Sequence, residues 1–266
     1  MQNFPIGILD SGVGGLSVWQ EIVSLLPHES TIYICDQKNI PYGEKTAEEV
    51  HQLARKLVLF LLKKQVKLIV LACNTITVSC LEELRQEFPQ VPIIGAVPVV
   101  KLAACISKTR KIGILSTTRT AESEYQQHII HTFAQDCTVI NEGTDELVPL
   151  IEKGDVGGVA QVLPRILQPF QTADIDTLAL GCTHYPFITQ QIANILGKDI
   201  QLLDSGAAIA RHVQRIEEHN ELFAANEKAT YAFYTTGNNE QFEEVARKLL
   251  NQAIRDKIGL AETVVL

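Results

Sequence analysis

The stretch IGILDSGVGGLSVWQEIVSLL at residues 6–26 decides the fold. It opens with an aliphatic run at 6–9 and passes through a turn of polar residues and glycines at 10–15. Apolar residues at helical spacing follow up to Leu26, and Pro27 ends that pattern because proline lacks a backbone N–H. A continuous apolar strand followed by an amphipathic helix predicts one unit of a parallel sheet that is covered on both faces.

The same alternation of short apolar runs and helical patterns continues along the chain. The other runs are TIYIC (31–35), LIVLA (68–72), VPII (91–94), KIGIL (111–115), TVI (138–140), TLAL (177–180) and IQLL (200–203). They are rich in aliphatic residues without polar alternation, as in strands buried on both faces. The order predicts an α/β fold with largely parallel sheets flanked by helices.

An internal repeat divides the chain into two similar halves. The matching pairs are IGILDSG (6–12) with IGILSTT (112–118), LACNT (71–75) with LGCTH (180–184), and loosely IIGAVPVV (93–100) with LLDSGAAI (202–209). The matches keep their order and a nearly constant spacing. They predict two pseudo-symmetric α/β domains, a discontinuous one at 1–98 plus 208–266 and a second at 99–207. The unmatched strand-like TYAFYTT (230–236) and helical QFEEVARKLL (241–250) are expected to complete the first sheet.

Composition and charge indicate a globular protein and disfavour several other classes of protein. The chain has 266 residues, of which 46% are hydrophobic and 20% charged, which is typical of a globular protein and not of a disordered one. The formal charge of -8 disfavours a nucleic-acid partner. The N-terminus lacks the pattern of a signal peptide and no apolar run is long enough to span a membrane, so a cytoplasmic protein is expected. Six cysteines in such a chain do not indicate a disulfide scaffold.

Polar residues follow four of the predicted strands, at the edge where ligands bind in open parallel sheets. They are Asp10-Ser11-Gly12, Cys73-Asn74-Thr75, Ser116-Thr117 and Cys182-Thr183-His184. A helix N-terminus after such a segment has free backbone N–H groups, which bind carboxylates and lower the pKa of nearby thiols.

Cys73 and Cys182 occupy equivalent places in the two halves. If the halves face each other, the two thiols approach a shared cleft from opposite sides. A thiol with a pKa near ~8.5 can act as base in one direction and as acid in the other. The pair therefore indicates a reaction that removes a proton from one face of a carbon and returns one to the other face. The remaining cysteines are interpreted as buried small hydrophobic side chains, namely Cys35, Cys80, Cys105 and Cys137.

Two further residues are candidates to assist the thiols. His184 follows Cys182 by two residues and could orient it or protonate near it, and Asp10 could stand beside Cys73. Glu152 lies in an otherwise apolar turn and could be only a solvated carboxylate at a helix end, so the residues by themselves do not select it.

Other chemistries remain open at this point. Cys73, Cys182 and His184 could hold a catalytic zinc, although no helical HExxH pair supports it. The two cysteines could form a redox disulfide, although such partners usually lie close in sequence. Gly12-Val13-Gly14 could begin a dinucleotide fingerprint, with Asp36 near the place of the ribose contact, but a lone G-x-G is weak evidence and a tightly packed turn explains it equally well.

The chain resembles the glutamate racemases, cofactor-independent bacterial isomerases that supply D-glutamate for peptidoglycan. The resemblance covers essentially the whole chain. It rests on GILDSGVGGLSV (7–18), PYG (41–43), ACNT (72–75), TxxT (117–120) with Ser123 and Tyr125, LVPLIEKG (147–154) and GCTHYP (181–186). Leu9 stands where the family usually has phenylalanine, which affects no chemical group. Aspartate racemases share the two-cysteine plan and are the alternative.

The resemblance implies that Cys73 and Cys182 transfer the protons, with Asp10 assisting the first and Glu152 and His184 the second. It implies glutamate as substrate and a site between two α/β domains, without metal, nucleotide or pyridoxal phosphate. A homodimer is a candidate assembly, and no membrane partner is implied. The implied substrate contacts are Asp10, Ser11, Tyr42, Gly43, Asn74, Thr75, Thr117, Thr183 and His184.

Overall fold

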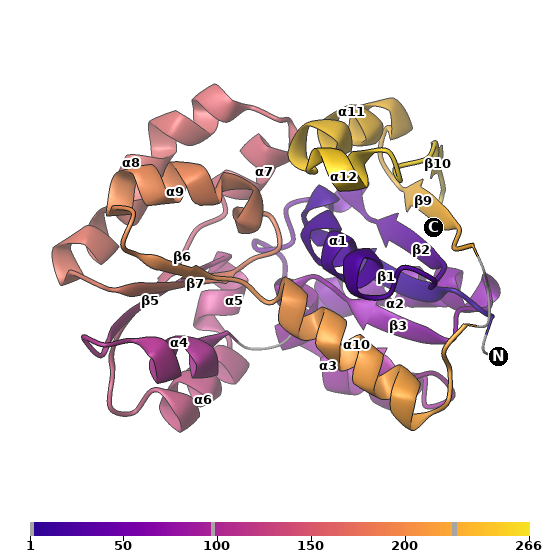
Figure 1. Cartoon of the computed structure of the whole chain (residues 1–266), viewed down its shortest axis with the longest axis horizontal. Helices are drawn as coiled ribbons and strands as arrows, with labels where there is room; N and C mark the ends of the chain where they lie inside the picture. The colour runs from indigo at the N-terminus through magenta and orange to yellow at the C-terminus, as the bar shows by residue number, and fades with distance from the viewer. Residues whose placement is uncertain (1–2, 97–98, 225–227) are drawn as a thin grey trace.

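Strand β1 (Ile6–Asp10) runs into the short 3-10 helix η1 (Val13–Gly15) and then into helix α1 (Leu16–Leu25), which confirms the predicted first unit. These elements come from a computed structural model that describes residues 3–96, 99–224 and 228–266. Every residue of β1 is buried, because the strand lies inside a sheet with helices on both faces. Figure 1 shows two lobes, each built on such a sheet.

The first lobe contains a six-stranded sheet in the order β10-β9-β2-β1-β3-β4, and every neighbouring pair is parallel. Its other strands are β2 (Thr31–Cys35), β3 (Leu68–Leu71), β4 (Ile93–Ile94), β9 (Tyr231–Thr235) and β10 (Ala261–Thr263). Its other helices are η2 (Gln37–Asn39), α2 (Ala47–Lys63), α3 (Asn74–Glu87), α10 (Gly206–His219), α11 (Asn239–Leu249) and α12 (Gln252–Arg255). The segment beyond the repeat thus completes this sheet, as predicted.

The second lobe contains a four-stranded parallel sheet in the order β6-β5-β7-β8. Its strands are β5 (Lys111–Ser116), β6 (Thr138–Gly143), β7 (Thr177–Gly181) and β8 (Gln201–Leu203). Its helices are α4 (Val100–Ile106), α5 (Thr118–Glu122), α6 (Glu124–Phe133), α7 (Leu147–Glu152), α8 (Val156–Ala173), η3 (Tyr185–Ile188) and α9 (Thr189–Leu196).

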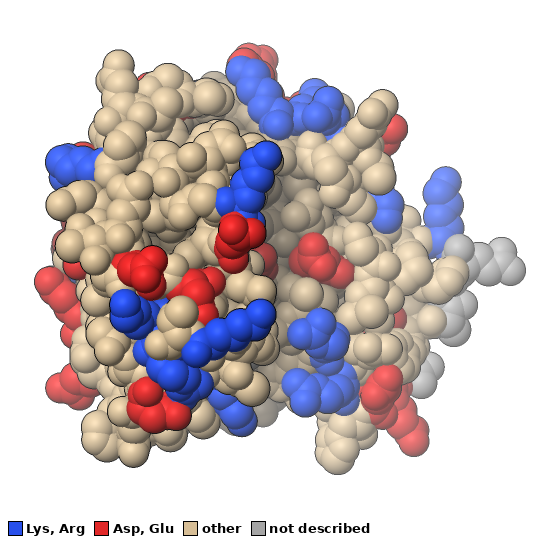
Figure 2. Space-filling model, turned by 60° about the vertical axis from the view of Figure 1, so that its left-hand side comes forward, with Lys and Arg blue, Asp and Glu red and all other residues tan. Residues whose placement is uncertain are grey.

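The two sheets repeat one topology, which is the structural form of the sequence repeat. The order β2-β1-β3-β4 of the first sheet matches β6-β5-β7-β8 of the second, with β1 equivalent to β5 and β3 equivalent to β7. The third sequence match aligns the edge strands β4 and β8, but its residues 97–98, where the predicted domain boundary also falls, lie outside the described residues. Figure 2 shows a hollow between the two lobes with side chains of both charges on its rim.

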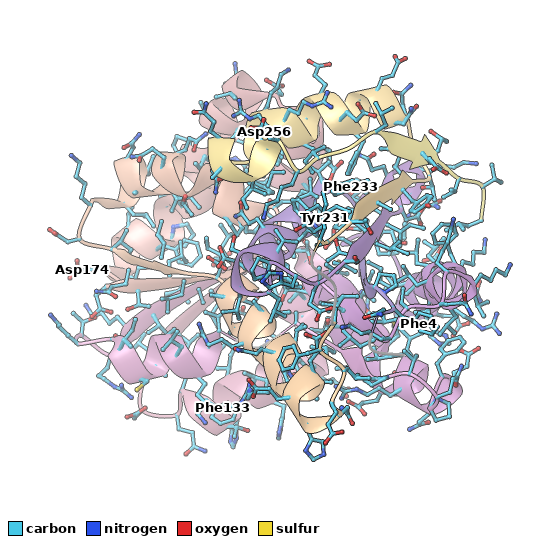
Figure 3. The ribbon with its side chains drawn as sticks, turned by 45° about the vertical axis from the view of Figure 1, so that its right-hand side comes forward. Phe4, Phe133, Asp174, Tyr231, Phe233 and Asp256 are labelled. Atoms are coloured by element: carbon cyan, nitrogen blue, oxygen red, sulfur yellow. The ribbon has the colours of Figure 1, made fainter. Side chains whose placement is uncertain are left out.

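Each sheet separates two apolar clusters. In the first lobe, α1, α10 and α11 cover one face and α2 and α3 the other. Trp19 of α1 packs edge-on against Tyr231 and Phe233 of β9, at ring-centroid distances of 5.7 and 5.2 Å, and Figure 3 labels both β9 side chains. Strand β9 is therefore part of the main core and not a peripheral addition. In the second lobe, α7, α8 and α9 cover one face and α4 and α6 the other.

Some predicted features differ from the structure. Strand β4 has only two residues, whereas β6 extends to Gly143, beyond the predicted run. The interpretation of all four remaining cysteines as buried is wrong for two of them: Cys105 is exposed on α4 and Cys137 is half-buried, while Cys35 and Cys80 are buried. An amphipathic helix of seven residues has an outer face, and Cys105 falls on it. Among the described residues, no helix combines the length and apolarity needed to cross a membrane.

Candidate active site

The carboxyl ends of β1 and β3 in the first lobe face those of β5 and β7 in the second. Hydrogen bonds join the lobes there: Thr75 Oγ1 lies 2.9 Å from Thr117 Oγ1, and the Thr183 hydroxyl donates to Asp10 Oδ2 at 3.1 Å. The Ser17 hydroxyl donates to the Thr183 carbonyl at 2.8 Å. The polar residues that sequence analysis placed after four separate strands therefore meet at one interface, as the topology of open parallel sheets requires.

Cys73 enters this interface from the first lobe. It caps the N-terminus of α3, and its side chain is buried. Its Sγ lies 3.8 Å from Ser11 Oγ, which in turn donates to Asp10 Oδ1 at 3.4 Å. Asp10 thus approaches the thiol through Ser11 rather than through a direct hydrogen bond. Burial and the nearby Asp10 carboxylate raise the pKa of the Cys73 thiol well above its ordinary value, so the sulfur holds its proton in this state.

Asp10 is completely buried at the end of β1. Its carboxylate accepts from the Gly12 backbone N–H at 3.0 Å and from the Thr183 hydroxyl. Burial raises the pKa of Asp10 to about 6, although the charge of His184 and these hydrogen bonds act against the rise. Asp10 is therefore an anion at neutral pH with a proton affinity well above that of an exposed carboxylate.

Cys182 enters from the second lobe, next to a buried chain of polar groups. Its Sγ lies 3.6 Å from His184 Nδ1, and His184 Nε2 lies 2.6 Å from Glu152 Oε1. Burial alone would lower the pKa of His184, but hydrogen bonds to Cys182 and Glu152 outweigh it and hold that pKa well above its ordinary value. The imidazole is thus a cation between a carboxylate and a sulfur, an arrangement that stabilises a thiolate.

Glu152 is not a solvated carboxylate, which was one of the two interpretations that the sequence left open. It is the last residue of α7 and is buried against the first lobe. Its Oε1 also accepts from the Val13 backbone N–H of η1 at 2.6 Å. The side chain therefore crosses from one lobe to the other.

The glycines of the first turn make room for these groups. A Cβ atom on Gly12 would overlap Glu152 Oε1, and one on Gly14 would overlap His184 Nδ1. The G-x-G pattern thus reflects close packing against the second lobe, and the space that a pyrophosphate would need is filled by Glu152 and His184. Asp36 is engaged elsewhere, since its carboxylate accepts from Asn39, Tyr42 and Thr236.

Both cysteines line one small cavity between the lobes, together with most of the predicted substrate contacts. The cavity has a volume of about 10 Å³, room for roughly one water molecule. Its lining residues are Ser11, Pro41, Tyr42, Gly43, Cys73, Asn74, Thr75, Thr117, Val148, Cys182, Thr183 and His184. Asp10 and Glu152 lie behind this lining. Sequence reasoning missed Pro41 and Val148, although both fall inside quoted motifs.

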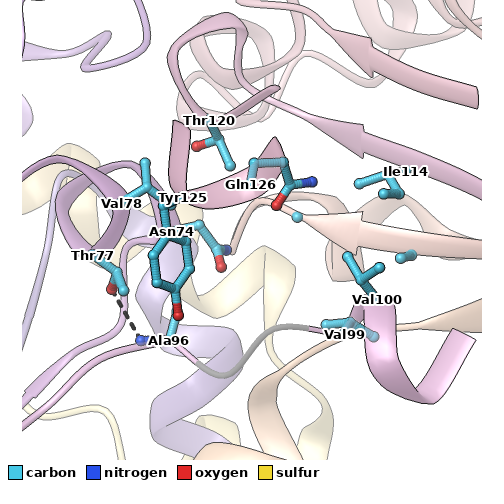
Figure 4. A pocket seen from close by; sticks show the side chains of 12 residues that line it. Asn74, Thr77, Val78, Ala96, Val99, Val100, Ile114, Thr120, Tyr125 and Gln126 are labelled. Carbon is cyan, nitrogen blue, oxygen red and sulfur yellow. Dashed lines mark hydrogen bonds between the residues drawn. The ribbon is translucent and has the colours of Figure 1, made fainter. Parts of the chain in front are cut away.

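A second cavity of about 30 Å³ also has Asn74 in its lining (Figure 4). Thr77 and Val78 line it from the first lobe, and Ile114 and Gln126 line it from the second. Asn74 lines both cavities, and its Nδ2 is a buried donor without a hydrogen-bond partner in the part of the chain that the structure describes. Such a donor is costly to leave unpaired and is available to a ligand acceptor.

Within the described ranges, no group of three or more His, Cys, Asp or Glu side chains is arranged to hold a metal ion. Cys73 and Cys182 are both free thiols. The zinc and disulfide alternatives thus gain no support from the arrangement of these side chains.

Comparison with known proteins gives consistent matches over the whole chain. A family model described as Asp/Glu/Hydantoin racemase matches residues 6–213. A glutamate racemase of Pseudomonas paraeruginosa is 40% identical over 246 residues, which is 92% of this chain and 93% of the relative. The fold matches a glutamate racemase isoform of Bacillus anthracis with a TM-score of 0.89, at 34% identity over 100% of this chain and 99% of the other. It also matches the glutamate racemase of Francisella tularensis in complex with D-glutamate, with a TM-score of 0.86, at 30% identity over 100% and 98% of the two chains.

Proposed function

Since the chain belongs to the Asp/Glu/Hydantoin racemase family and to the glutamate racemases within it, we propose that it interconverts L- and D-glutamate by proton transfer through Cys73 and Cys182. The observation that carries this proposal is that the two thiols line one cavity from opposite lobes. A base on one side and an acid on the other are what inversion at a carbon requires.

The two thiols have different surroundings, which suits this chemistry. Cys73 is a protonated thiol, whereas Cys182 lies beside the His184 cation. In one direction, the Cys182 thiolate removes the α-proton of glutamate, and the electron pair of the C–H bond stays on the α-carbon. The Cys73 thiol then gives its proton to the opposite face and becomes the thiolate. The reverse reaction exchanges the two roles, and no proton is lost or gained overall.

The assisting groups act through these two sulfurs. His184 and Glu152 stabilise the Cys182 thiolate before it accepts the proton. Asp10 and Ser11 act on the Cys73 side. Because the pKa of Asp10 is raised, its carboxylate can accept a proton from the thiol through Ser11 or a hydrogen bond from the substrate ammonium. On family resemblance, Cys182 acts on L-glutamate and Cys73 on D-glutamate.

The substrate carboxylates meet neutral donors rather than arginine. Asn74, whose Nδ2 has no hydrogen-bond partner among the described residues, lines the cavity at the N-terminus of α3, a helix that is kinked at Cys80. Thr75, Thr117 and Thr183 supply hydroxyls from both lobes. These preorganised donors stabilise the charge that develops as the proton leaves.

We also propose that the product serves peptidoglycan synthesis in the cytoplasm and that the protein forms a homodimer, both on family resemblance. Expression in a bacterium that requires D-glutamate should restore growth without the supplement. Sedimentation of the purified protein should give the mass of a dimer.

The direct test is the decay of the circular dichroism of L-glutamate, with the purified protein treated with chelator and supplied with no cofactor. The signal should fall to zero, and D-glutamate should give the mirror-image decay. Loss of activity on chelation with recovery on adding zinc would establish the metal alternative instead. Binding of D-glutamate without any decay would show a binding protein and not an enzyme.

Substrate specificity distinguishes a glutamate racemase from an aspartate racemase. A site that pairs a distal carboxylate leaves donors unpaired when the substrate is one methylene shorter, and the methylene itself contributes about 1–3 kcal/mol. We therefore expect kcat/KM for glutamate to exceed that for aspartate at least 10-fold, as ~1.4 kcal/mol would give. Equal values for the two amino acids would overturn the assignment to glutamate.

A further inference from the structure

Glu152 is held mainly by groups that belong to the other lobe. Its Oε1 receives the Val13 N–H, and its Oε2 receives a hydrogen bond from Gln37 Nε2 at 2.7 Å. Both donors lie in the first lobe, whereas Glu152 and its partner His184 belong to the second. Gln37 stands at the start of η2, just beyond β2, and was not among the residues that the sequence motifs selected.

The amide of Gln37 is itself fixed in one orientation. The Gly237 backbone N–H, which can only donate, donates to Thr235 Oγ1 at 3.0 Å. The Thr235 hydroxyl in turn donates to Gln37 Oε1 at 2.8 Å. Because a carboxylate only accepts hydrogen bonds, the amide NH2 of Gln37 must point toward Glu152, which leaves its Oε1 to accept from Thr235. Thr235 is completely buried at the end of β9, so this anchor is rigid.

These contacts form one chain of hydrogen bonds from β9 to a proposed catalytic sulfur. It runs from Gly237 through Thr235, Gln37 and Glu152 to His184, whose Nδ1 lies beside Cys182 Sγ. Cys73 is reached by a different set of contacts, through Ser11 and Asp10, and Asp10 accepts from the Thr183 hydroxyl of the second lobe. Among the described residues, none of these contacts involves Gln37 or Thr235.

We propose that Gln37, oriented by Thr235, is a positioning residue for the Cys182 side of the reaction: it holds the Glu152 carboxylate against His184 and thereby sustains the Cys182 thiolate. The inference rests on the proposed two-cysteine racemisation. The inference extends that mechanism by assigning to strand β9 of the first lobe a role in the chemistry of Cys182, which belongs to the second lobe.

An opening of about 350 Å³ borders the hydrogen bond between Gln37 and Glu152. It limits how far the loss of this hydrogen bond can slow the reaction. Gln37 and Glu152 both line it, together with Lys153 and Gln241. Water can therefore replace the lost donor in a variant, but it does not restore the fixed orientation. We expect a reduction of about 10- to 100-fold, equivalent to one hydrogen bond to a charged group, rather than complete loss.

Racemisation alone cannot test a one-sided role. The equilibrium constant between enantiomers is one, so any variant must change kcat/KM equally in both directions. Elimination from a glutamate carrying a leaving group on the β-carbon needs only the first proton removal, so each enantiomer reports on one sulfur. The variants are Gln37→Met, which keeps the length of the side chain, and Thr235→Val, which keeps its shape. Gln241→Met is the matched control, because Gln241 is exposed on the same opening.

The enantiomer that Cys182→Ser no longer processes is identified first. Gln37→Met and Thr235→Val should slow elimination from that enantiomer about 10- to 100-fold and leave the other within about twofold, while Gln241→Met changes neither. Equal slowing of both enantiomers would show a merely structural role, and unchanged rates would show no role; either result overturns the inference. If the wild-type protein processes neither enantiomer, it is the proposed function that fails.

Discussion

Gly12 and Gly14 show how a single residue type serves the site. Their backbone lies where Glu152 and His184 of the other lobe must pass, and any side chain would occupy that space. Gly12 has φ −159°, an extended conformation open to any residue, so its freedom of rotation is not what the site requires. The requirement is the missing side chain.

The substitution Gly12→Ala should therefore lower the racemase activity far more than it lowers the free energy of unfolding. Its Cβ displaces Glu152 from the Val13 N–H and from His184, and we expect kcat to fall at least about 100-fold, as the loss of ~3 kcal/mol of positioned hydrogen bonding implies. Gly157→Ala in α8 is the control, because the nearest atom to its Cβ would be Asp155 Oδ1 at 3.6 Å. Racemase activity and urea unfolding measure the two effects. A fully active Gly12→Ala enzyme would show that Glu152 does not need its observed position.

Replacing each of the two thiols in turn is the strictest test of the two-base mechanism at the level of residues. Cys73→Ser and Cys182→Ser should each abolish racemisation, because inversion needs an acid and a base on opposite faces. Each variant should still eliminate the β-substituted analogue with one enantiomeric preference, and the two preferences should be opposite.

Two controls accompany that measurement. Cys35→Ser and Cys80→Ser alter buried thiols outside the cavity and should leave racemisation in place. If they were equally damaging, the choice of the pair would be wrong. If both Cys73→Ser and Cys182→Ser preferred the same enantiomer, the two-base mechanism would be wrong.

At the level of elements, the unit β9–α11 supports the turn after β1. Phe242 of α11 is fully buried, and its ring lies 6.1 Å from that of Tyr33. The Tyr33 hydroxyl donates to the Gly12 carbonyl at 2.5 Å. Helix α11 thus packs behind the tyrosine that holds the turn after β1, although it lies far from that turn in sequence.

We expect Phe242→Ala to lower the free energy of unfolding by about 3–5 kcal/mol, as removal of a buried phenylalanine does. It should also lower the activity of the folded fraction, since Tyr33 loses its packing partner. Phe242→Leu retains most of the volume and should be milder on both counts. Urea unfolding followed by fluorescence, together with activity below the transition, checks both. An unchanged unfolding midpoint for Phe242→Ala would show that α11 is not part of the cooperative core.

At the level of the whole molecule, the closed cavity implies movement of the lobes. A space for roughly one water molecule does not admit glutamate, so we expect the lobes to separate for substrate to enter. Cross-lobe contacts such as Thr75 with Thr117 and Glu152 with Gln37 are then broken and remade in each cycle. Assembly of the Cys182 environment is thereby tied to closure, because the Val13 and Gln37 donors reach Glu152 only when the lobes meet.

A buried charge cluster links α10 to the base of the first sheet. Lys67 pairs with Glu29 and, at 2.7 Å, with Glu217, and all three side chains are buried. Two carboxylates share one lysine. Burial raises the pKa of Glu217 to about 7, and the neighbouring Glu29 adds to the rise while Lys67 opposes it. The folded protein therefore holds a proton on Glu217 that the unfolded chain releases near its ordinary value.

The sign of the pH effect follows from that difference. The contribution of Glu217 to stability is complete below about 4.5, its unfolded value, and is lost as the pH rises through about 7. Glu217→Gln should thus become more stable relative to wild type between pH 5 and pH 8, as measured by urea unfolding at several pH values. A relative stability that falls over this range would mean that Lys67 holds the Glu217 carboxylate ionised.

Much of the fold was predictable because its signals are local. Apolar runs and helical spacing located all eight strands of the repeat and the added β9, since each is a short segment buried on both faces. The repeat also placed Cys73 and Cys182 in equivalent positions, and the two sheets share one strand order. Strand ends of parallel sheets collect on one edge, so the segments that could carry chemistry were visible without coordinates.

The burial of Glu152, the exposure of Cys105 and the part played by Gln37 were decided only by the tertiary structure. The hydrogen bond between Gln37 and Glu152 joins residues 115 positions apart, and that between Thr235 and Gln37 joins residues 198 apart. No sequence pattern marks Gln37, because periodicity reports which face of an element is apolar and not which side chain of another lobe it meets. The distance and orientation between the two sheets determine those contacts, and they are set by the packing of the whole chain.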